Sequence, residues 1–251
     1  MRKAKTLVAV PSAQEWKILF PRVPYSKTLE HPYAVNRLFD AACVGIGIVN
    51  FASNLTKLIC AKKYFRVIVV GIAGALPHSE LKTGDLVRVD QECVGDIGYW
   101  NGDEFRSFFQ KPQVFSATSA KLAPLPVAKL PGVRGISVNT LTSSESALEY
   151  RAKFFGAQVE AMEAAAAFQI SQTLGAQIFE VRAISNFTGD MDKNRWNFKQ
   201  SLLSLKNNVL IPMWENVKGF RSAWAFPLAP MILLFTKLSS AEWTVPRSSG
   251  T

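Results

Sequence analysis

Short apolar runs alternate with longer amphipathic stretches along most of this chain. The apolar runs are rich in β-branched residues and lack a regular alternation of apolar and polar positions, which is typical of strands covered on both faces. We expect buried strands at Leu7–Val10, Val67–Val70, Leu86–Val89, Gly135–Val138 and Phe179–Ile184. The runs are too short to be ordinary helices, so the pattern favours a sheet at the centre of the fold.

The longer stretches between these runs have helical periodicity. Asn50–Lys62 places Phe51, Leu55 and Leu58 on one side, and Ser144–Phe155 and Met162–Leu174 show the same spacing. Strands that alternate with helices predict an α/β fold with a largely parallel sheet. The intervening stretches 95–102 and 110–131 are rich in glycine, proline and aromatic residues and are predicted to be loops.

The composition divides the chain into two parts of different character. Residues 1–217 carry the alternating pattern and are predicted to form one domain. Residues 218–251 contain Trp224, Trp243 and a polar end, and form a tail that is an appendage, an oligomer contact or partly a remnant of cloning. The pattern leaves these alternatives open, so the tail takes no part in the fold prediction.

Composition and charge exclude several classes of protein. Of the 251 residues, 48% are apolar and 19% are charged, as in folded globular domains. The net charge of +10 comes from scattered basic residues, so no nucleic-acid partner is expected. Three cysteines without a close pair and two histidines predict neither a disulfide framework nor a metal site. The most apolar run, 223–235, is too short to span a bilayer, and no secretion signal is seen, so we expect a cytoplasmic protein without a membrane partner.

Candidate chemistry lies where the predicted strands end, because ligands of open α/β sheets bind beyond the carboxyl ends of the strands. Glu15 follows the first strand, although an acidic residue in a first helical turn is also favoured by the helix dipole. Gly71 and Gly74 follow the second strand and would let a ligand approach the backbone amides. This turn lacks the spacing of a dinucleotide site and the Lys-Ser/Thr of a P-loop, so neither NAD nor ATP is suggested.

Two further segments carry polar residues beside apolar ones. Glu160 and Glu163 precede an alanine-rich helix, where they are either the exposed start of a buried helix or acceptors for the hydroxyls of a sugar. The last predicted strand ends in Ser185 and Asn186, and a loop with acidic and basic residues follows it. Taken alone, the Ser-Asn pair indicates a turn.

Together these segments resemble the superfamily of purine nucleoside phosphorylases and nucleosidases over residues 6–217. The resemblance rests on the order and spacing of Glu15, Val44–Gly47, Gly71–Leu76 before Leu81–Val87, Met162-Glu163 and Arg182–Asn186. It implies a three-layer α/β/α sandwich with a central mixed, largely parallel twisted sheet. It also implies an enzyme without a metal or organic cofactor.

Within the superfamily the chain is similar to the hydrolases. A phosphorylase needs anion ligands, often with a hydroxyl near the glycine-rich turn, and Ile72 offers none. The stretches that resemble futalosine hydrolases are Val138–Thr142, Val159–Glu163, Gly95–Gly98 and Gly189–Trp196. The resemblance implies hydrolysis of the N-glycosidic bond of a purine nucleoside. For futalosine, a nucleoside of menaquinone biosynthesis with a carboxyphenyl ketone at its 5′ end, the products are hypoxanthine and dehypoxanthine futalosine.

The same resemblance implies roles for individual residues. Glu15 would orient and deprotonate the water, Glu163 would hold the ribose 2′ and 3′ hydroxyls, and Asn186 would contact purine N7. Substrate-binding positions are Ile72, Ala73 and Gly74 in the turn, Met162 against the sugar, and Ile46 and Trp196 at the 5′ group. Arg195 is preferred over Lys193 as the partner of the 5′ carboxylate, because its planar fork binds both oxygens. The family implies a homodimer, in which Tyr99, Trp100 and Phe105 could contribute to the interface or to the core.

Three alternatives stay open at this point. Nucleosidases that release adenine from methylthioadenosine, S-adenosylhomocysteine or 6-amino-6-deoxyfutalosine have an Asp where Asn186 stands, and this difference favours a 6-oxopurine. A phosphorolytic enzyme would depend on phosphate. A non-catalytic nucleoside-binding protein would bind without turnover.

Overall fold

The structure, a computed structural model, describes residues 5–25 and 32–215. The predicted tail at 218–251 lies outside these residues, and the division into a domain and a tail stays a prediction. The strands are β1 Thr6–Val10, β2 Tyr33–Ala34, β3 Phe39–Cys43, β4 Arg66–Ala75, β5 Leu86–Val94, β6 Gly98–Asn101, β7 Glu104–Ser107, β8 Phe115–Ser116, β9 Gly132–Ser137, β10 Val159–Ala161 and β11 Gln177–Phe187. The α-helices are α1 Ala13–Leu19, α2 Ile48–Lys62, α3 Glu145–Phe155, α4 Ala164–Thr173, α5 Phe198–Leu205 and α6 Ile211–Glu215.

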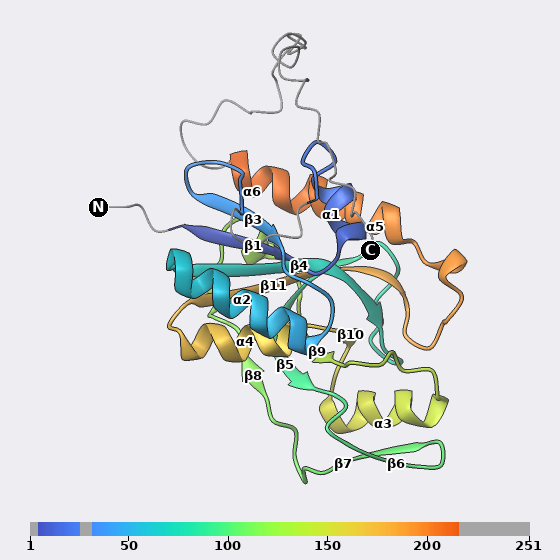
Figure 1. Cartoon of the computed structure of the whole chain (residues 1–251). Helices are drawn as coiled ribbons and strands as arrows, with labels where there is room; N and C mark the ends of the chain where they lie inside the picture. Colours follow the sequence, from blue (N-terminus) through green and yellow to red (C-terminus); the bar gives the residue numbers. More distant parts are fainter. Residues whose placement is uncertain (1–4, 26–31, 216–251) are drawn as a thin grey trace, which may run out of the picture. The chain divides into compact units, whose positions relative to one another are not determined.

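The described part of the chain folds around a mixed sheet of nine strands, along which the order is β10-β9-β5-β11-β4-β1-β3-β2, with β8 beside β5 (Figure 1). Strand β4 is parallel to both β1 and β11, whereas β5 is parallel to β9 and antiparallel to β11. Strand β10 pairs with β9 on one side and antiparallel with β4 on the other. The strands β10, β9, β5, β11 and β4 are therefore joined into a closed ring at one side of the sheet.

Helices cover both faces of the sheet. Successive residues of the central strands point to opposite faces, and both faces are apolar. Val8, Ile68 and Val181 pack in one core with the apolar sides of α1, α5 and α6. Leu7 and Val67 pack in a second core with α2 and α4. The α/β/α sandwich with a mixed sheet is confirmed, and Figure 1 shows α2 and α4 on the side of the sheet opposite to α5 and α6.

Strands β4 and β11 extend further than their apolar runs predict. Strand β4 continues past Val70 to Ala75, so the segment predicted to be a turn is a strand instead. Strand β11 continues past Ile184 to Phe187 and includes the Ser-Asn pair. The two extensions pair with each other as parallel strands, and this pairing supplies the backbone hydrogen bonds that a turn would have lacked.

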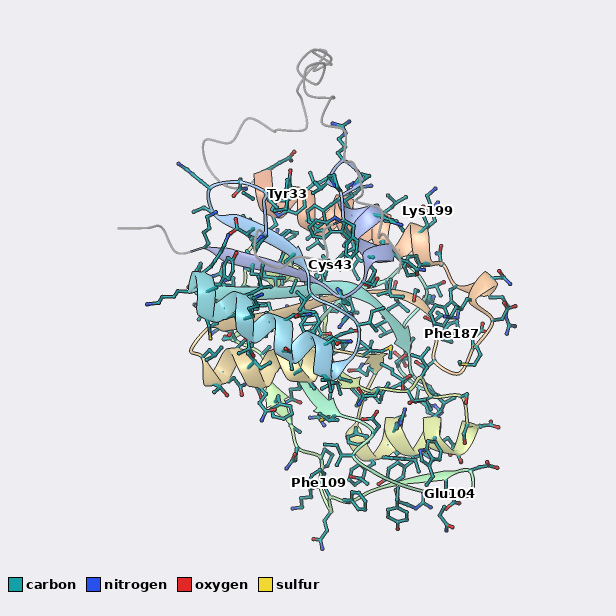
Figure 2. All side chains as sticks on the ribbon, viewed as in Figure 1. Tyr33, Cys43, Glu104, Phe109, Phe187 and Lys199 are labelled. Atoms are coloured by element: carbon teal, nitrogen blue, oxygen red, sulfur yellow. The ribbon has the colours of Figure 1, made fainter. Side chains whose placement is uncertain are left out.

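A separate hairpin of β6 and β7 projects from the segment predicted to be a loop. Figure 2 shows Glu104 and Phe109 in this region, far from Lys199 on α5. Phe105 is buried, with its ring against those of Trp100 and Tyr150. Tyr99 and Trp100 are half exposed. Of the three residues considered for an interface, Phe105 therefore belongs to the interior.

Candidate active site

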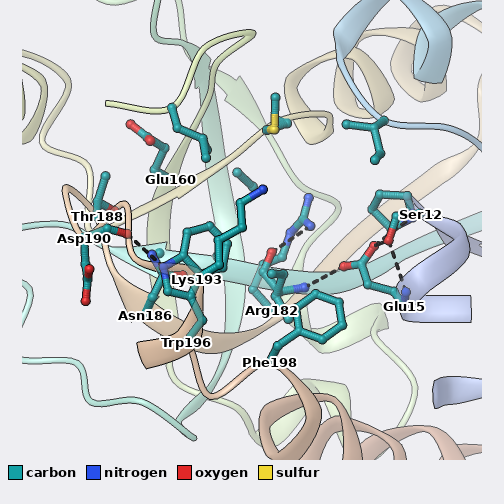
Figure 3. A pocket seen from close by; sticks show the side chains of 18 of the residues that line it. Ser12, Glu15, Glu160, Arg182, Asn186, Thr188, Asp190, Lys193, Trp196 and Phe198 are labelled. Atoms are coloured by element: carbon teal, nitrogen blue, oxygen red, sulfur yellow. Dashed lines mark hydrogen bonds between the residues drawn. The ribbon is translucent and has the colours of Figure 1, made fainter. Parts of the chain in front are cut away.

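A cavity of about 200 Å³ opens beside the carboxyl ends of β1, β4 and β11. Most of the residues predicted to form the site line it, namely Glu15, Ile46, Ile72, Ala73, Gly74, Met162, Glu163, Asn186 and Trp196. Figure 3 shows Ser12, Glu15 and Arg182 toward one end of the cavity and Glu160, Thr188 and Asp190 toward the other. The fold thus gathers residues that are far apart in the sequence around one cavity.

Glu15 is fixed by the start of α1. Ser12 is the N-cap, and its hydroxyl accepts a hydrogen bond from the Glu15 N–H at 3.1 Å. In return, Glu15 Oε2 accepts hydrogen bonds from the Ser12 N–H at 2.9 Å and the Ser12 hydroxyl at 2.6 Å, which completes a capping box. The other oxygen, Oε1, accepts from the N–H of Ile72 at 3.0 Å. The carboxylate is therefore held by a helix start and by a neighbouring strand.

The position of Glu15 changes its acidity. The residue is only 3% exposed, and burial raises the pKa of its carboxyl to about 7. The negative charge of Glu163 raises this pKa as well, whereas the hydrogen bonds from Ser12 and Ile72 and the charge of Arg182 lower it. A carboxylate with a pKa near neutrality is suited to accept a proton from water.

Arg182 lies beside Glu15 and Glu163 in the interior of the protein. Its Nη2 is 3.4 Å from Glu163 Oε2, and its Nη1 donates to the carbonyl of Ile72 at 3.1 Å. A Cβ at Gly71 would lie 2.5 Å from Glu15 Oε1 and 2.8 Å from Arg182 Nη1, so glycine is needed for this close approach. Glu163, the N-cap of α4, is buried and not an exposed helix start.

A β-bulge sets the direction of Asn186. Ile184 pairs with Ala73 and Asn186 pairs with Gly74, so Ser185 is the extra residue of β11. The Ser185 hydroxyl donates to Asn186 Oδ1 at 2.7 Å, and Asn186 Nδ2 donates to the carbonyl of Phe187 at 3.0 Å. Because an amide nitrogen carries two hydrogens, Nδ2 keeps one for a ligand in the cavity.

Glu160 lies in β10 and takes part in a second buried cluster. Glu160 Oε1 accepts from the N–H of Thr142 at 3.0 Å, and Oε2 accepts from the Thr142 hydroxyl. Nη1 of Arg151 donates to the Thr142 hydroxyl and lies 3.3 Å from Glu160 Oε2. Burial raises the pKa of Glu160, and the Thr142 hydrogen bonds and the Arg151 charge oppose this rise. Thr142 and Glu160 both line the cavity, so this cluster forms part of its wall.

The loop after β11 supplies the remaining wall. Trp196 donates its indole N–H to the carbonyl of Asp190 at 2.8 Å, and the ring lines the cavity with Phe198. Lys193 also lines the cavity, and Figure 3 shows its amine over it. Arg195, by contrast, is not among the lining residues: its side chain is 69% exposed and its Nη2 is 2.7 Å from Asp190 Oδ1. The structure thus brings Lys193, and not Arg195, to the site.

Sequence reasoning did not assign site roles to Ser12, Thr142, Arg182 or Phe198. Two of them have a recognisable sequence signal: a Ser three residues before Glu15 is typical of a capping box, and Arg182 interrupts an apolar strand, where a charged residue needs buried partners.

Residues 5–25 and 32–215 contain no group of three His, Cys, Asp or Glu placed to hold a metal ion. In the same residues, no helix combines the length and apolar character needed to cross a bilayer.

Two futalosine hydrolases are similar to this chain in sequence. A futalosine hydrolase from Thermus thermophilus is 30% identical over 176 residues, which cover 66% of this chain and 76% of that protein. A futalosine hydrolase from Streptomyces coelicolor is 28% identical over 196 residues, which cover 72% of this chain and 81% of that protein. These relatives match most of their own length.

Solved structures show the same fold at lower identity. A futalosine hydrolase mutant from Helicobacter pylori matches with a TM-score of 0.70 and 19% identity, over 85% of this chain and 100% of that one. A 5'-methylthioadenosine/S-adenosyl homocysteine nucleosidase from Campylobacter jejuni matches with a TM-score of 0.68 and 20% identity, over 85% of this chain and 100% of that one. The family described as "Phosphorylase superfamily" matches residues 41–209. The chain therefore belongs to the phosphorylase superfamily and, within it, to the futalosine hydrolases.

Proposed function

We propose that this protein hydrolyses the N-glycosidic bond of futalosine, releasing hypoxanthine and dehypoxanthine futalosine. The observation that carries the proposal is the buried carboxyl of Glu15, whose pKa is about 7, in one cavity with Glu163 and Asn186. Similarity to futalosine hydrolases supports the choice of substrate.

In this proposal Glu15 is the general base. Cleavage of an N-glycosidic bond develops positive charge on the ribose, and the enzyme gains rate by stabilising that charge and by activating water. The ionised Glu15 takes a proton from the attacking water. Glu163 accepts hydrogen bonds from the ribose 2′ and 3′ hydroxyls, and Met162 packs against the sugar. The two carboxylates place negative charge beside the developing cation.

Asn186 and the glycine-rich part of β4 hold the base. The free hydrogen of Asn186 Nδ2 donates to purine N7, and the backbone at Ile72, Ala73 and Gly74 lies along the substrate. An amide does not release a proton as a carboxylic acid does, so this residue suits a 6-oxopurine better than a 6-aminopurine. This reasoning favours hypoxanthine as the leaving group.

We assign the 5′ carboxylate of the substrate to Lys193, with Ile46 and Trp196 against the aromatic ring. Among residues 5–25 and 32–215, no carboxylate lies within ion-pair distance of Lys193 Nζ. The guanidinium of Arg195 is occupied by Asp190. The charge over the cavity that a carboxylate can reach therefore comes from Lys193.

We also propose a cytoplasmic homodimer. Ile46, Phe187 and Met191 are apolar and more than half exposed, and Ile46 and Met191 line the cavity. A second copy that covered these side chains would bury apolar surface and close the 5′ side of the site. Size-exclusion chromatography with light scattering tests the subunit number, and cell fractionation tests the location.

The decisive experiment is product analysis in phosphate-free buffer. The purified protein is incubated separately with futalosine, 6-amino-6-deoxyfutalosine, methylthioadenosine and inosine, and the released base is identified by chromatography. Hypoxanthine released from futalosine supports the proposal. Adenine release would move the substrate to the 6-amino compounds, release that requires phosphate would indicate a phosphorylase, and binding without release would indicate a nucleoside-binding protein.

A further inference from the structure

A chain of buried charged side chains extends from the cavity into the interior, beyond the residues that can touch a substrate. Arg182 Nε is 2.6 Å from Oε1 of Glu180, and both side chains are almost completely buried. The Glu180 carboxyl in turn lies within hydrogen-bond range of the Glu92 carboxyl on β5. Glu92 Oε2 accepts a hydrogen bond from the Ser137 hydroxyl at 3.0 Å. The cavity is thus connected to Glu92 through Arg182 and Glu180.

Among the carboxyl oxygens of Glu92 and Glu180, two lack a hydrogen-bond donor from the described residues. They are Oε1 of Glu92 and Oε2 of Glu180, and both are fully buried. The second oxygen of each carboxyl has a donor, from Ser137 in one case and Arg182 in the other. A buried acceptor without a donor is costly, and a single proton shared between the two carboxyls would satisfy both.

The local charge also requires a proton. The guanidinium of Arg182 faces both members of this pair, the Glu163 carboxyl also faces Glu180, and Glu15 lies on the far side of Arg182. Four carboxyls therefore surround one cation, and four ionised carboxylates in a buried space would be strongly unfavourable. Burial and the charge of Glu180 raise the pKa of Glu92 well above its ordinary value. At Glu180 the Arg182 guanidinium, 2.6 Å away, opposes the rise in pKa that burial causes, which favours Glu92 as the carboxyl that carries the proton.

Space for Glu92 comes from a glycine on the adjacent strand. A Cβ at Gly135 in β9 would lie 2.2 Å from Glu92 Oε1. Gly71 makes the corresponding space beside the cavity, where Glu15 and Arg182 approach each other. Glycine on two separate strands is what lets these side chains occupy the interior.

We propose that Glu92 is a neutral carboxylic acid that donates a hydrogen bond to Glu180, and that Glu180 thereby holds Arg182 in place between Glu15 and Glu163. Glu92 and Glu180 are positioning residues that touch no substrate. Without Glu180, the Arg182 guanidinium would turn toward the carboxylates of the cavity. The effect of this arrangement on catalysis rests on the proposed function, whereas the proton on Glu92 does not.

The test compares two variants that make the same chemical change at equal burial. Glu92→Gln supplies a carbonyl to accept from Ser137 and an N–H to donate to Glu180, so kcat is expected to stay within about twofold of the parent. Glu180→Gln removes the charge that holds Arg182, and kcat is expected to fall about 10- to 100-fold, as for groups that orient a metal ligand. Equal losses in both variants would overturn the neutral assignment of Glu92, and a normal Glu180→Gln enzyme would overturn the positioning role.

The pH profile separates positioning from a general loss of structure. In Glu180→Gln the Arg182 guanidinium is released toward Glu15, and its positive charge favours the ionised form of Glu15. The acidic limb of kcat/KM should move to lower pH in this variant and stay in place in Glu92→Gln. A reduced rate with an unmoved limb would contradict positioning.

A last measurement needs neither substrate nor a folded Glu180 variant. Isotope-edited infrared spectroscopy of the parent at a pH well above 7, where Glu15 is ionised, should show the carbonyl band of a protonated glutamic acid, and Glu92→Gln should remove it. Absence of that band would overturn the proposal even if futalosine is cleaved. Its presence in a protein that releases no purine would leave the assignment of Glu92 intact and refute the proposed function.

Discussion

Two of the buried glutamates that line the cavity, Glu15 and Glu160, are equally inaccessible to solvent and differ in their partners. Each is 3% exposed, and burial is the largest influence on each pKa. All three hydrogen bonds to the Glu15 carboxylate come from neutral donors on Ser12 and Ile72. Glu160 is bound by Thr142 and also has its own guanidinium, that of Arg151.

Two glutamate side chains of equal burial can therefore have different roles, because their neighbours differ. Arg182 is the cation beside Glu15, but its shortest ion pair is with Glu180. Glu15 therefore keeps a pKa of about 7 and can exchange a proton. The cation nearest to Glu160 is bound to Glu160 itself and to Thr142, which gives a fixed wall. Burial raises the pKa of both carboxyls, and at Glu160 the hydrogen bonds from Thr142 and the charge of Arg151 oppose that rise.

Replacing each glutamate by glutamine tests this difference directly. We expect Glu15→Gln to lower kcat by about 10²- to 10⁴-fold, the usual contribution of a general base, with little change in the affinity for the product base. Glu160→Gln should retain most of its turnover, because Glu160 holds the wall and moves no proton. Steady-state kinetics and calorimetric titration of the purine measure both quantities. Unchanged turnover in Glu15→Gln would remove it from the mechanism.

The same two variants should rank in the opposite order in stability. Glu160→Gln leaves the Arg151 guanidinium buried without an anionic partner, and we expect a loss of about 3–5 kcal/mol in the free energy of unfolding. Glu15→Gln replaces a buried carboxylate whose hydrogen-bond donors are all neutral, and should cost less. Urea denaturation measures both values. A Glu160→Gln protein as stable as the parent would show that Arg151 does not depend on Glu160.

The sequence could predict the local structure of the chain but not the full order of the sheet. The alternation of apolar runs and amphipathic stretches is local, and it indicated the α/β class and the positions of α2, α3 and α4. Strand β5 lies between β9 and β11 and is antiparallel to β11. This arrangement depends on contacts between distant segments, which the local periodicity of the sequence does not predict.

The site shows the same division. Glu15 follows a strand and could be singled out, whereas the burial of Glu163 and the bulge at Ser185 required the folded chain. Arg195 was preferred to Lys193 on chemical grounds, and both residues lie in one short turn. Which of the two side chains points into the cavity depends on the ion pair between Arg195 and Asp190, a contact that the residue types alone do not specify.

The pH profile of the parent enzyme tests the acidity of Glu15. A general base acts only when it is ionised, so kcat/KM should fall about tenfold for each unit of pH below the pKa of the free enzyme. With a pKa of about 7, the fall should begin near neutrality. Glu160→Gln should keep the limb at the same pH, since the change is at the other end of the cavity. A plateau extending well into the acidic range would contradict the assignment.

Asn186→Asp tests the residue that contacts the base. A carboxylic acid can release a proton to N7 where the amide cannot, so the variant should shift the ratio of kcat/KM toward 6-aminopurine nucleosides, by about tenfold if the net difference equals one hydrogen bond of about 1.4 kcal/mol. Competition between futalosine and 6-amino-6-deoxyfutalosine measures this ratio. An unchanged ratio would mean that selection of the 6-substituent lies elsewhere in the wall.

The smallest effect is expected at the 5′ carboxylate. Lys193→Met removes the amine over the cavity and should raise KM for futalosine about two- to fivefold, which is the range for an exposed ion pair, with kcat little changed. Arg195→Met is the matched control, because its guanidinium is paired with Asp190 and does not line the cavity. The difference between the two variants should shrink at high salt, which screens exposed charges, and should vanish for inosine, which lacks the carboxylate. A larger effect from Arg195→Met would show that the loop turns when substrate binds and that the exposed guanidinium, despite its partner, reaches the 5′ group.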